Sequence, residues 1–250
     1  MATFLSLQAL ESDDMVTAGR TSKQQDATIL TFTRTQALAE SLQQLTASEA
    51  LHIDTSISFK SPNQMCEMDS VDAIFIEVNA PSAIDESLDL VKKIRLASHA
   101  SDIFMLFTHP KSFSSANCYL AGVDHCVKLP GDQLEKTNLL STIFHDSVWN
   151  AKIKLTLDRT RLLLYADVNK VEISYTEMTI LEALINAPQH IMSHNSIAKT
   201  LDPNVVFYDP RALEKTISRL RTKIRNAYNI ELIHSVRGFG YRLRRGVIST

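Results

Sequence analysis

The chain has 250 residues, 44% apolar and 22% charged, which is enough for two domains of ordinary size with buried cores. No segment approaches the roughly 18 uncharged apolar residues of a membrane helix, and residues 1–14 lack the features of a secretory signal, so we expect a cytoplasmic protein. The net charge of −2 is uneven: residues 1–150 carry 10 Lys and Arg against 19 Asp and Glu, whereas residues 151–250 carry 16 against 9, which suggests that the second half meets a polyanion.

In the first half, short apolar runs alternate with segments of helical periodicity. Residues 1–26 are polar and without periodicity, and we predict a loose N-terminal arm there. The expected strands are 27–32, 52–59, 71–78, 103–107 and 126–129, and the expected helices are 37–45, 63–68, 88–96, 114–121 and 134–148. Strands that alternate with helices indicate a parallel sheet with crossover helices. We therefore predict a doubly wound α/β domain over residues 27–147.

After an expected linker at residues 146–151, the pattern changes to that of a small α+β domain over residues 152–246. The expected strands are 153–157, 161–165 and 170–173. Ser174 then opens a helix with Glu177 in capping-box spacing, and Pro188 ends it. Further helices are expected at 193–201 and from Asp209 or Pro210 to Tyr228, followed by a hairpin of strands 230–236 and 241–243. Strands, three helices and a terminal hairpin predict a winged helix-turn-helix.

The predicted helix that ends at Tyr228 separates an apolar stripe from a basic face. On one side lie Leu213, Ile217, Leu220, Ile224 and Ala227. The other side and its flanks carry Arg211, Lys215, Ser218, Arg219, Arg221, Thr222 and Arg225. Such a face suits a DNA major groove, where arginine pairs with guanine and neighbouring basic residues hold phosphates. The competing interpretation is an ordinary amphipathic helix with a solvated basic face.

The hairpin favours the DNA interpretation. Its turn sequence, Arg237-Gly238-Phe239-Gly240-Tyr241-Arg242, places an arginine at a flexible tip and another in the following strand. An arginine that protrudes beside a recognition helix can enter the narrow minor groove, where the potential is most negative. We therefore add Arg237 and Arg242 to the candidate DNA-binding residues.

Residues 173–177, 212–221 and 236–242 together resemble the effector domain of OmpR/PhoB-type response regulators. The resemblance implies that the helix ending at Tyr228 is the recognition helix and that residues 202–208 form a loop that contacts RNA polymerase in some members. It places Arg221 at a phosphate contact and Arg237 at the minor-groove position of the wing. The family has histidine or another polar residue where this chain has Thr216, so the base preference does not transfer.

The first half resembles a receiver domain with a degenerate phosphorylation site. The segment 71–81 matches the third receiver strand, but Glu77 replaces the phosphoacceptor aspartate, and Thr33 and Arg34 stand where two acids would hold Mg²⁺. Thr108 matches the switch hydroxyl, and Lys128 lies one place from the lysine position. Aspartyl phosphorylation needs a placed carboxylate, a divalent cation and a lysine. An ion pair of Arg34 with Glu77 is expected to replace the metal, although Glu77 as a mere polar residue at a strand end is the simpler alternative.

We expect no cofactor and no metal site. His190 and His194 are four residues apart, but Ile191 stands where an HExxH motif needs glutamate. Cys66, Cys118 and Cys126 form no CxxC pair, which argues against a disulfide framework or a zinc ribbon. With no nucleophile–base pair visible, the chain is predicted not to be an enzyme.

The sequence thus predicts a DNA-binding transcriptional regulator that works without phosphorylation and without a sensor kinase. Two alternatives remain: a conventional phosphorylated response regulator, and a winged-helix adaptor that binds protein. Since one recognition helix contacts few base pairs, we expect a homodimer on DNA. The expected dimer surface comprises residues 112–121, 126–129 and 133–144, unless the apolar residues there only pack the last helix onto the sheet.

Overall fold

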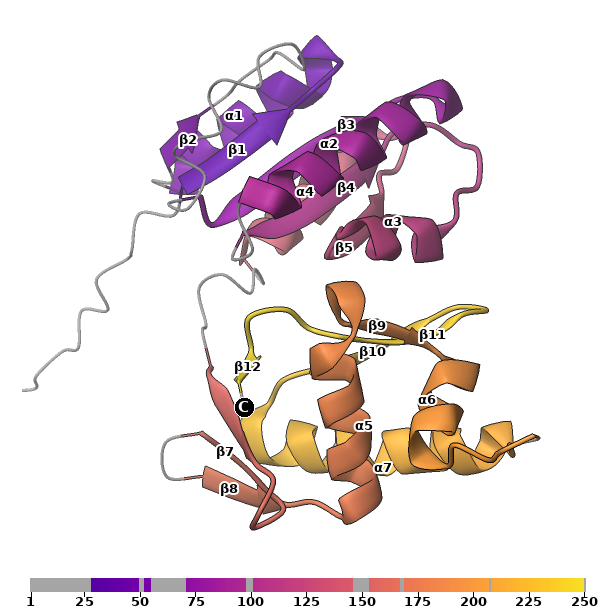
Figure 1. Ribbon diagram of the computed structural model, residues 1–250. Coiled ribbons are helices and arrows are strands. Elements are labelled where there is room, and N and C mark those ends of the chain that lie inside the picture. The colour runs from indigo at the N-terminus through magenta and orange to yellow at the C-terminus, as the bar shows by residue number, and fades with distance from the viewer. Residues whose placement is uncertain are drawn as a thin grey trace, which may run out of the picture.

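The computed structural model describes residues 28–49, 52–54, 71–97, 101–145, 153–166, 169–206 and 208–249. These residues form two units, each with its own sheets and core, which lie one above the other in Figure 1. The expected arm at 1–26, the short helix at 63–68 and the linker at 146–151 lie outside the described residues. Within the described part of the chain, no helix is long and apolar enough to cross a membrane.

The N-terminal unit is built on a parallel sheet of five strands in the order β2-β1-β3-β4-β5. The strands are β1 (Thr28–Phe32), β2 (His52–Asp54), β3 (Ala73–Val78), β4 (Asp102–Phe107) and β5 (His125–Lys128). All of β3 and nearly all of β4 are buried. Central strands that are covered on both faces have continuous apolar sequences, which is why β3 and β4 were predictable from the sequence.

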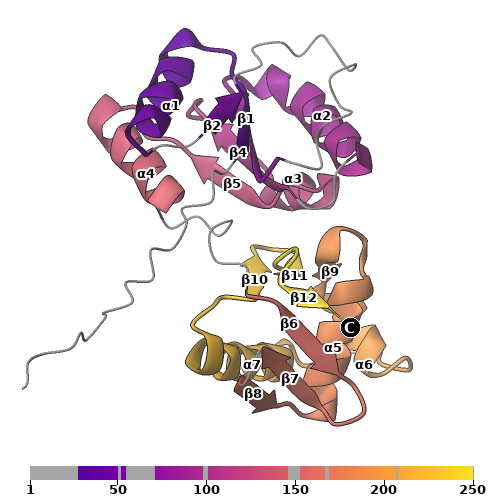
Figure 2. The same cartoon turned by 90° about the vertical axis from the view of Figure 1, so that its left-hand side faces the viewer.

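Helices cover both faces of this sheet. They are α1 (Gln36–Glu49), α2 (Ile84–Ala97), α3 (Ser115–Ala121) and α4 (Gln133–His145). One core lies beneath α1 and α4, and a second lies beneath α2 and α3. Figures 1 and 2 show how these helices are arranged around the sheet. The strand order and the two helical layers define a doubly wound, flavodoxin-like fold, as predicted. Leu139 and Ile143 of α4 pack against the sheet core, whereas Leu134 is 70% exposed.

The C-terminal unit is a winged helix-turn-helix, also as predicted. An antiparallel set of strands comes first: β6 (Leu155–Asp158), β7 (Leu163–Ala166) and β8 (Asn169–Glu172). The helices are α5 (Tyr175–Asn186), α6 (His194–Leu201) and α7 (Pro210–Tyr228). The hairpin of β10 (Ile233–Val236) and β11 (Gly240–Leu243) follows. We call this hairpin, with its turn at residues 237–239, the wing.

Two short strands escaped the sequence analysis. After a 3-10 turn at Pro188–His190, β9 (Ile191–Ser193) pairs with β11, and β12 (Ile248–Ser249) pairs with β6. Strands of two or three residues are too short to show an alternating pattern, so their pairing depends on the distant strand that receives them.

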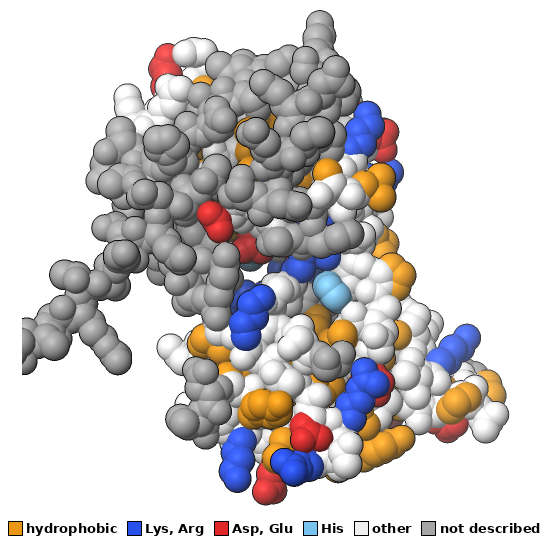
Figure 3. Space-filling model, turned by 60° about the vertical axis from the view of Figure 1, so that its left-hand side comes forward, with side chains coloured by type: hydrophobic (Ala, Val, Ile, Leu, Met, Phe, Trp, Pro, Cys, Tyr) orange, Lys and Arg blue, Asp and Glu red, His pale blue; other side chains and the backbone are white. Residues whose placement is uncertain are grey.

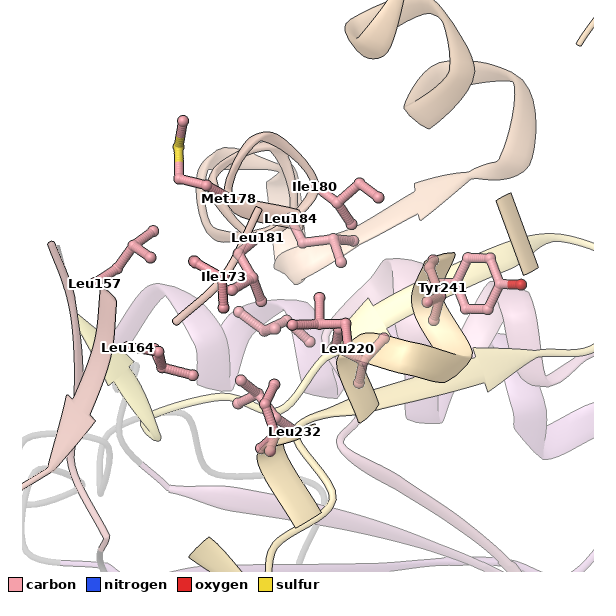
Figure 4. Packing of buried hydrophobic residues seen from close by; sticks show 14 of the residues in the cluster. Leu157, Leu164, Ile173, Met178, Ile180, Leu181, Leu184, Leu220, Leu232 and Tyr241 are labelled. Atoms are coloured by element: carbon pink, nitrogen blue, oxygen red, sulfur yellow. The ribbon is translucent and has the colours of Figure 1, made fainter. Parts of the chain in front are cut away.

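One apolar core joins the elements of the C-terminal unit. Figure 4 shows Leu181 and Leu184 of α5 beside Leu220 of α7, with Tyr241 of β11 at one side of the cluster. The expected capping box is present: the Ser174 hydroxyl accepts from the backbone N–H of Glu177, and the Glu177 carboxylate accepts from the backbone N–H of Ser174. Lys223 of α7 donates to the same carboxylate at 2.7 Å, so the start of α5 is joined to α7.

Candidate nucleic-acid interface and the Glu77 site

The helix α7 begins and ends with strong local signals. The Asp209 carboxylate accepts from the backbone N–H of Arg211 at 2.9 Å, and Pro210 occupies the first helical position, where its missing N–H is no loss. Asn229 ends the helix in the left-handed conformation, with φ of 52°. The helix is thereby fixed from Pro210 to Tyr228, close to the predicted bounds.

The basic face of α7 is on the surface. Its apolar stripe is buried in the core, whereas Arg211, Lys215, Ser218, Arg219 and Thr222 are exposed. The Thr222 hydroxyl donates to the Ser218 carbonyl one turn earlier, at 3.0 Å. Guanidinium, ammonium and hydroxyl groups therefore share one exposed face, in the arrangement that the sequence predicted.

Two other candidate DNA-binding residues on α7, Arg221 and Arg225, bind groups of this same chain. The Arg221 guanidinium donates from Nε to the Ile233 carbonyl at 2.8 Å and from Nη2 to the Ser235 hydroxyl at 3.0 Å. Burial lowers the pKa of Arg221 from its ordinary value. Arg225 pairs with Glu231 at 2.7 Å on the surface. Arg221 thus joins α7 to the wing, a role that the sequence analysis did not assign to it.

The wing depends on two glycines for different reasons. Gly238 has φ of +71° and open space around it, so its backbone conformation is what favours glycine. At Gly240 a Cβ atom would lie 2.0 Å from the Met192 carbonyl oxygen, because β11 passes very close to β9. Arg237 is exposed in the turn between the two strands of the wing. The structure therefore leaves Arg237 accessible in the turn of the wing.

The structure contradicts the prediction that Arg242 contacts DNA. Its side chain is 8% exposed, and its guanidinium carbon lies 4.4 Å from the centroid of the Tyr119 ring in the N-terminal unit. Successive side chains of a strand point to opposite faces. Since Tyr241 and Leu243 enter the core of the C-terminal unit, Arg242 points to the other face, which the N-terminal unit covers.

In the N-terminal unit, the Glu77 carboxylate is buried and held by hydrogen bonds at the carboxyl ends of β1, β3 and β4. It is 1% exposed. Its Oε2 accepts from the backbone N–H groups of Arg34 at 2.6 Å and of Thr35 at 2.8 Å. Its Oε1 accepts from the hydroxyls of Thr35 at 2.8 Å and of Thr108 at 3.3 Å. Since Thr35 precedes α1 directly, the negative charge also faces the start of that helix, where it is favourable.

Of the predicted partners of Glu77, one contacts it and two differ from expectation. The Thr108 hydroxyl donates to Glu77. The expected Arg34–Glu77 ion pair is wrong: Arg34 binds Glu77 through its backbone, and its guanidinium pairs with Glu86 at 2.5 Å. The Lys128 ammonium donates to the Pro110 carbonyl at 3.0 Å. The structure therefore does not bring Lys128 to the carboxylate as a remnant of the receiver lysine.

The sequence analysis missed Thr35 and Glu86. Thr35 could have been found as a capping residue before the helix that the sequence predicted from residue 37. The pairing of Arg34 with Glu86 left no signal, because 52 residues separate them. Among the described residues, no group of three or more His, Cys, Asp or Glu side chains is placed to hold a metal ion.

Comparison with known proteins identifies relatives of both units. Residues 168–243 match the family "Transcriptional regulatory protein, C terminal". The response regulator MprA of Mycobacterium ulcerans is 24% identical over 86% of this chain and 97% of its own length. The transcriptional regulatory protein PhoP of Escherichia coli is 23% identical over 68% of this chain and 78% of its own length. The crystal structure of DrrB, an OmpR/PhoB homologue of Thermotoga maritima, covers 87% of this chain and 98% of DrrB at 14% identity, with a TM-score of 0.41.

Proposed function

We propose that the chain is a DNA-binding transcriptional response regulator of the OmpR/PhoB type, and that it recognises specific DNA sites without aspartyl phosphorylation. The exposed residues of α7 and Arg237 of the wing are the proposed DNA contacts, with Arg221 and Arg225 contributing at the edge of this surface. Arg219 lies near the centre of the exposed face, where a base contact is expected.

The hydrogen bonds of Glu77 carry the proposal that phosphorylation is not needed. An ionised carboxylate offers about four acceptor positions. In Glu77 four donors occupy them, and the group is buried. To attack a phosphoryl group or to bind Mg²⁺, an oxygen would have to give up donors that hold the start of α1. Thr33 and Arg34 also supply no carboxylate for the metal.

We further propose that the protein contacts RNA polymerase through residues 202–208 and binds DNA as a homodimer. Within that loop the Val206 side chain is 84% exposed and so is accessible to a partner protein. For the dimer, exposed Leu134 on α4 is the natural centre, because the neighbouring apolar residues of α4 pack inward. Protection of a single half-site in footprinting, unchanged as protein concentration rises, would contradict the dimer.

Phosphorylation is tested directly on the full chain. We expect incubation with acetyl phosphate and Mg²⁺ to give no added phosphate by intact-mass spectrometry. Glu77→Asp is an informative companion, because it restores the shorter side chain while the metal-holding acids are still missing, and it should also remain unmodified. An acyl phosphate on any carboxylate of the N-terminal unit would restore the conventional response-regulator alternative.

DNA recognition is tested by selecting bound sequences from a random pool and then measuring salt dependence. Binding should weaken steeply with salt, because neutralised phosphates release counterions. Arg219→Ala should relax base preference by about 1–3 kcal/mol at its contact. Arg161→Ala, which removes an exposed arginine from the β6–β7 turn, is the charge-matched control and should bind as the wild type does. Equal binding by both variants would favour the protein-binding adaptor.

A further inference from the structure

The strand β11 is buried on both faces, one by its own unit and the other by the N-terminal unit. Tyr241 and Leu243 lie in the core of the C-terminal unit. Arg242 lies over the ring of Tyr119, which belongs to α3. Figures 1 and 2 both show β11 on the side of its unit that faces the N-terminal unit, and Figure 3 shows basic side chains and a histidine where the two units meet.

A buried ion cluster lies beside this ring contact. One oxygen of the Asp124 carboxylate, just before β5, pairs with Arg95 and accepts from the backbone N–H of Ile103. The other oxygen pairs with Arg245, which follows β11, at 3.2 Å. Both Asp124 and Arg95 are buried, and Arg245 is nearly so. A shared carboxylate between two buried arginines is costly to disrupt, because it leaves charge without a partner.

The turn before β9 completes the contact. Arg245 donates from Nη2 to the Gln189 side-chain oxygen at 2.8 Å. Gln189 and His190 both have positive φ, 54° and 56°, a backbone conformation that non-glycine residues adopt rarely. At Gly122 a Cβ would lie 3.0 Å from that same Gln189 oxygen, so the two units approach closely here. Such strain persists only where surrounding contacts maintain it.

We propose that Tyr119 and Asp124 of the N-terminal unit act, through Arg242 and Arg245, as positioning residues for the wing. The turn at 237–239 is at one end of β11, and Arg242 and Arg245 are at the other. At about 3.3 Å per residue, the exposed Arg237 lies within roughly 20 Å of Arg242 along the chain. The N-terminal unit thus sets the position and the mobility of the hairpin that bears the proposed minor-groove contact. This inference rests on the proposed DNA-binding function.

The contact leaves the proposed DNA surface open. The basic residues of α7 and Arg237 are exposed while Arg242 and Arg245 are held by the N-terminal unit. The contact therefore restrains the wing and does not cover the proposed DNA surface. If its purpose were to inhibit, breaking it would increase DNA binding; as a positioning contact, breaking it decreases binding.

The test is a double-mutant cycle between Tyr119 and Arg237 in the full chain, measured on a selected DNA site. Tyr119→Leu removes a ring that belongs to the other unit and is not among the proposed DNA contacts, and it should weaken binding about three- to tenfold, in keeping with the usual size of coupling between linked sites. In the Arg237→Ala background the same change should have little effect. Tyr119→Phe keeps the ring face and should bind as the wild type does, and Tyr175→Leu, an exposed tyrosine of α5, is the matched control.

Hydrogen exchange of β10 and β11 gives a second measurement that needs no DNA. Tyr119→Leu and Arg245→Gln should both raise the exchange rate of the wing amides several-fold relative to Tyr175→Leu. Three results overturn the proposal: unchanged exchange in the wing, tighter DNA binding, or an effect of Tyr119→Leu that is the same with and without Arg237. If the wild type fails to bind any DNA while exchange responds as expected, the DNA-binding function fails and the interdomain support of the wing stands.

Discussion

Replacing Glu77 with glutamine tests whether the carboxylate serves as a structural acceptor. Glutamine has the same shape, and its oxygen can accept from the backbone N–H groups of Arg34 and Thr35, while its amide nitrogen meets the hydroxyls of Thr35 and Thr108. What is lost is the charge. A hydrogen bond to a charged group contributes about 1.5–3 kcal/mol and a neutral one about 0.5–1.5, so two N–H bonds lose about 2 kcal/mol in all. The interaction with the start of α1 contributes roughly 0.5 kcal/mol more.

The opposing term is the cost of burying a charge, which glutamine avoids. Because donors occupy all four acceptor positions of Glu77, we expect the hydrogen bonds to outweigh that cost. Glu77→Gln should lower the free energy of unfolding of the N-terminal unit by about 2 kcal/mol and its melting temperature by about 8 °C. Calorimetry of the full chain measures this. The control Glu86→Gln, at a carboxylate that is 58% exposed, should change stability by less than about 0.5 kcal/mol. A Glu77→Gln protein as stable as the wild type would refute the reasoning.

Two further predictions concern the wing and the interdomain contact. Gly240→Ala should destabilise the C-terminal unit by about 2–3 kcal/mol, because the added methyl group overpacks against β9. Gly238→Ala should destabilise it by about 1 kcal/mol, because residue 238 has a positive φ. Urea unfolding measures both losses, and equal losses would be inconsistent with the β9 contact. Burial lowers the pKa of His125 and of His234 to about 4 each, from 6.5. Their contribution to the free energy of the interdomain contact is therefore present above pH 6.5 and is lost as the pH falls toward 4. Burial raises the pKa of Asp102 to about 6, so this one group acts in the opposite direction and favours the contact at low pH. Burial also lowers the pKa of His190, so three histidines oppose Asp102. We expect the contact to weaken between pH 6.5 and 5, seen as a larger radius of gyration in X-ray scattering; a constant radius would contradict this.

The sequence by itself determined the order of the longer elements and the exposed face of α7. These features depend on local signals: the buried runs of β3 and β4, the capping box at Ser174, and the helical periodicity that separates Leu220 from Arg219. Such signals arise from residues within a few positions of each other, since backbone hydrogen bonding fixes the repeat of a helix or strand. For the same reason the exposure of Arg237 in a turn was predictable.

Only the tertiary structure decided the partners of the charged groups. Glu77 was visible as an unusual residue at a strand end, but its donors come from residues 31 to 43 positions away. Arg242 looked like a DNA contact in sequence, yet it lies against a ring of the other unit. Arginine and glutamate have long side chains with several possible partners, and the local sequence does not distinguish among them. The choice depends on which distant segments the packing of the two cores, and of the two units, brings together.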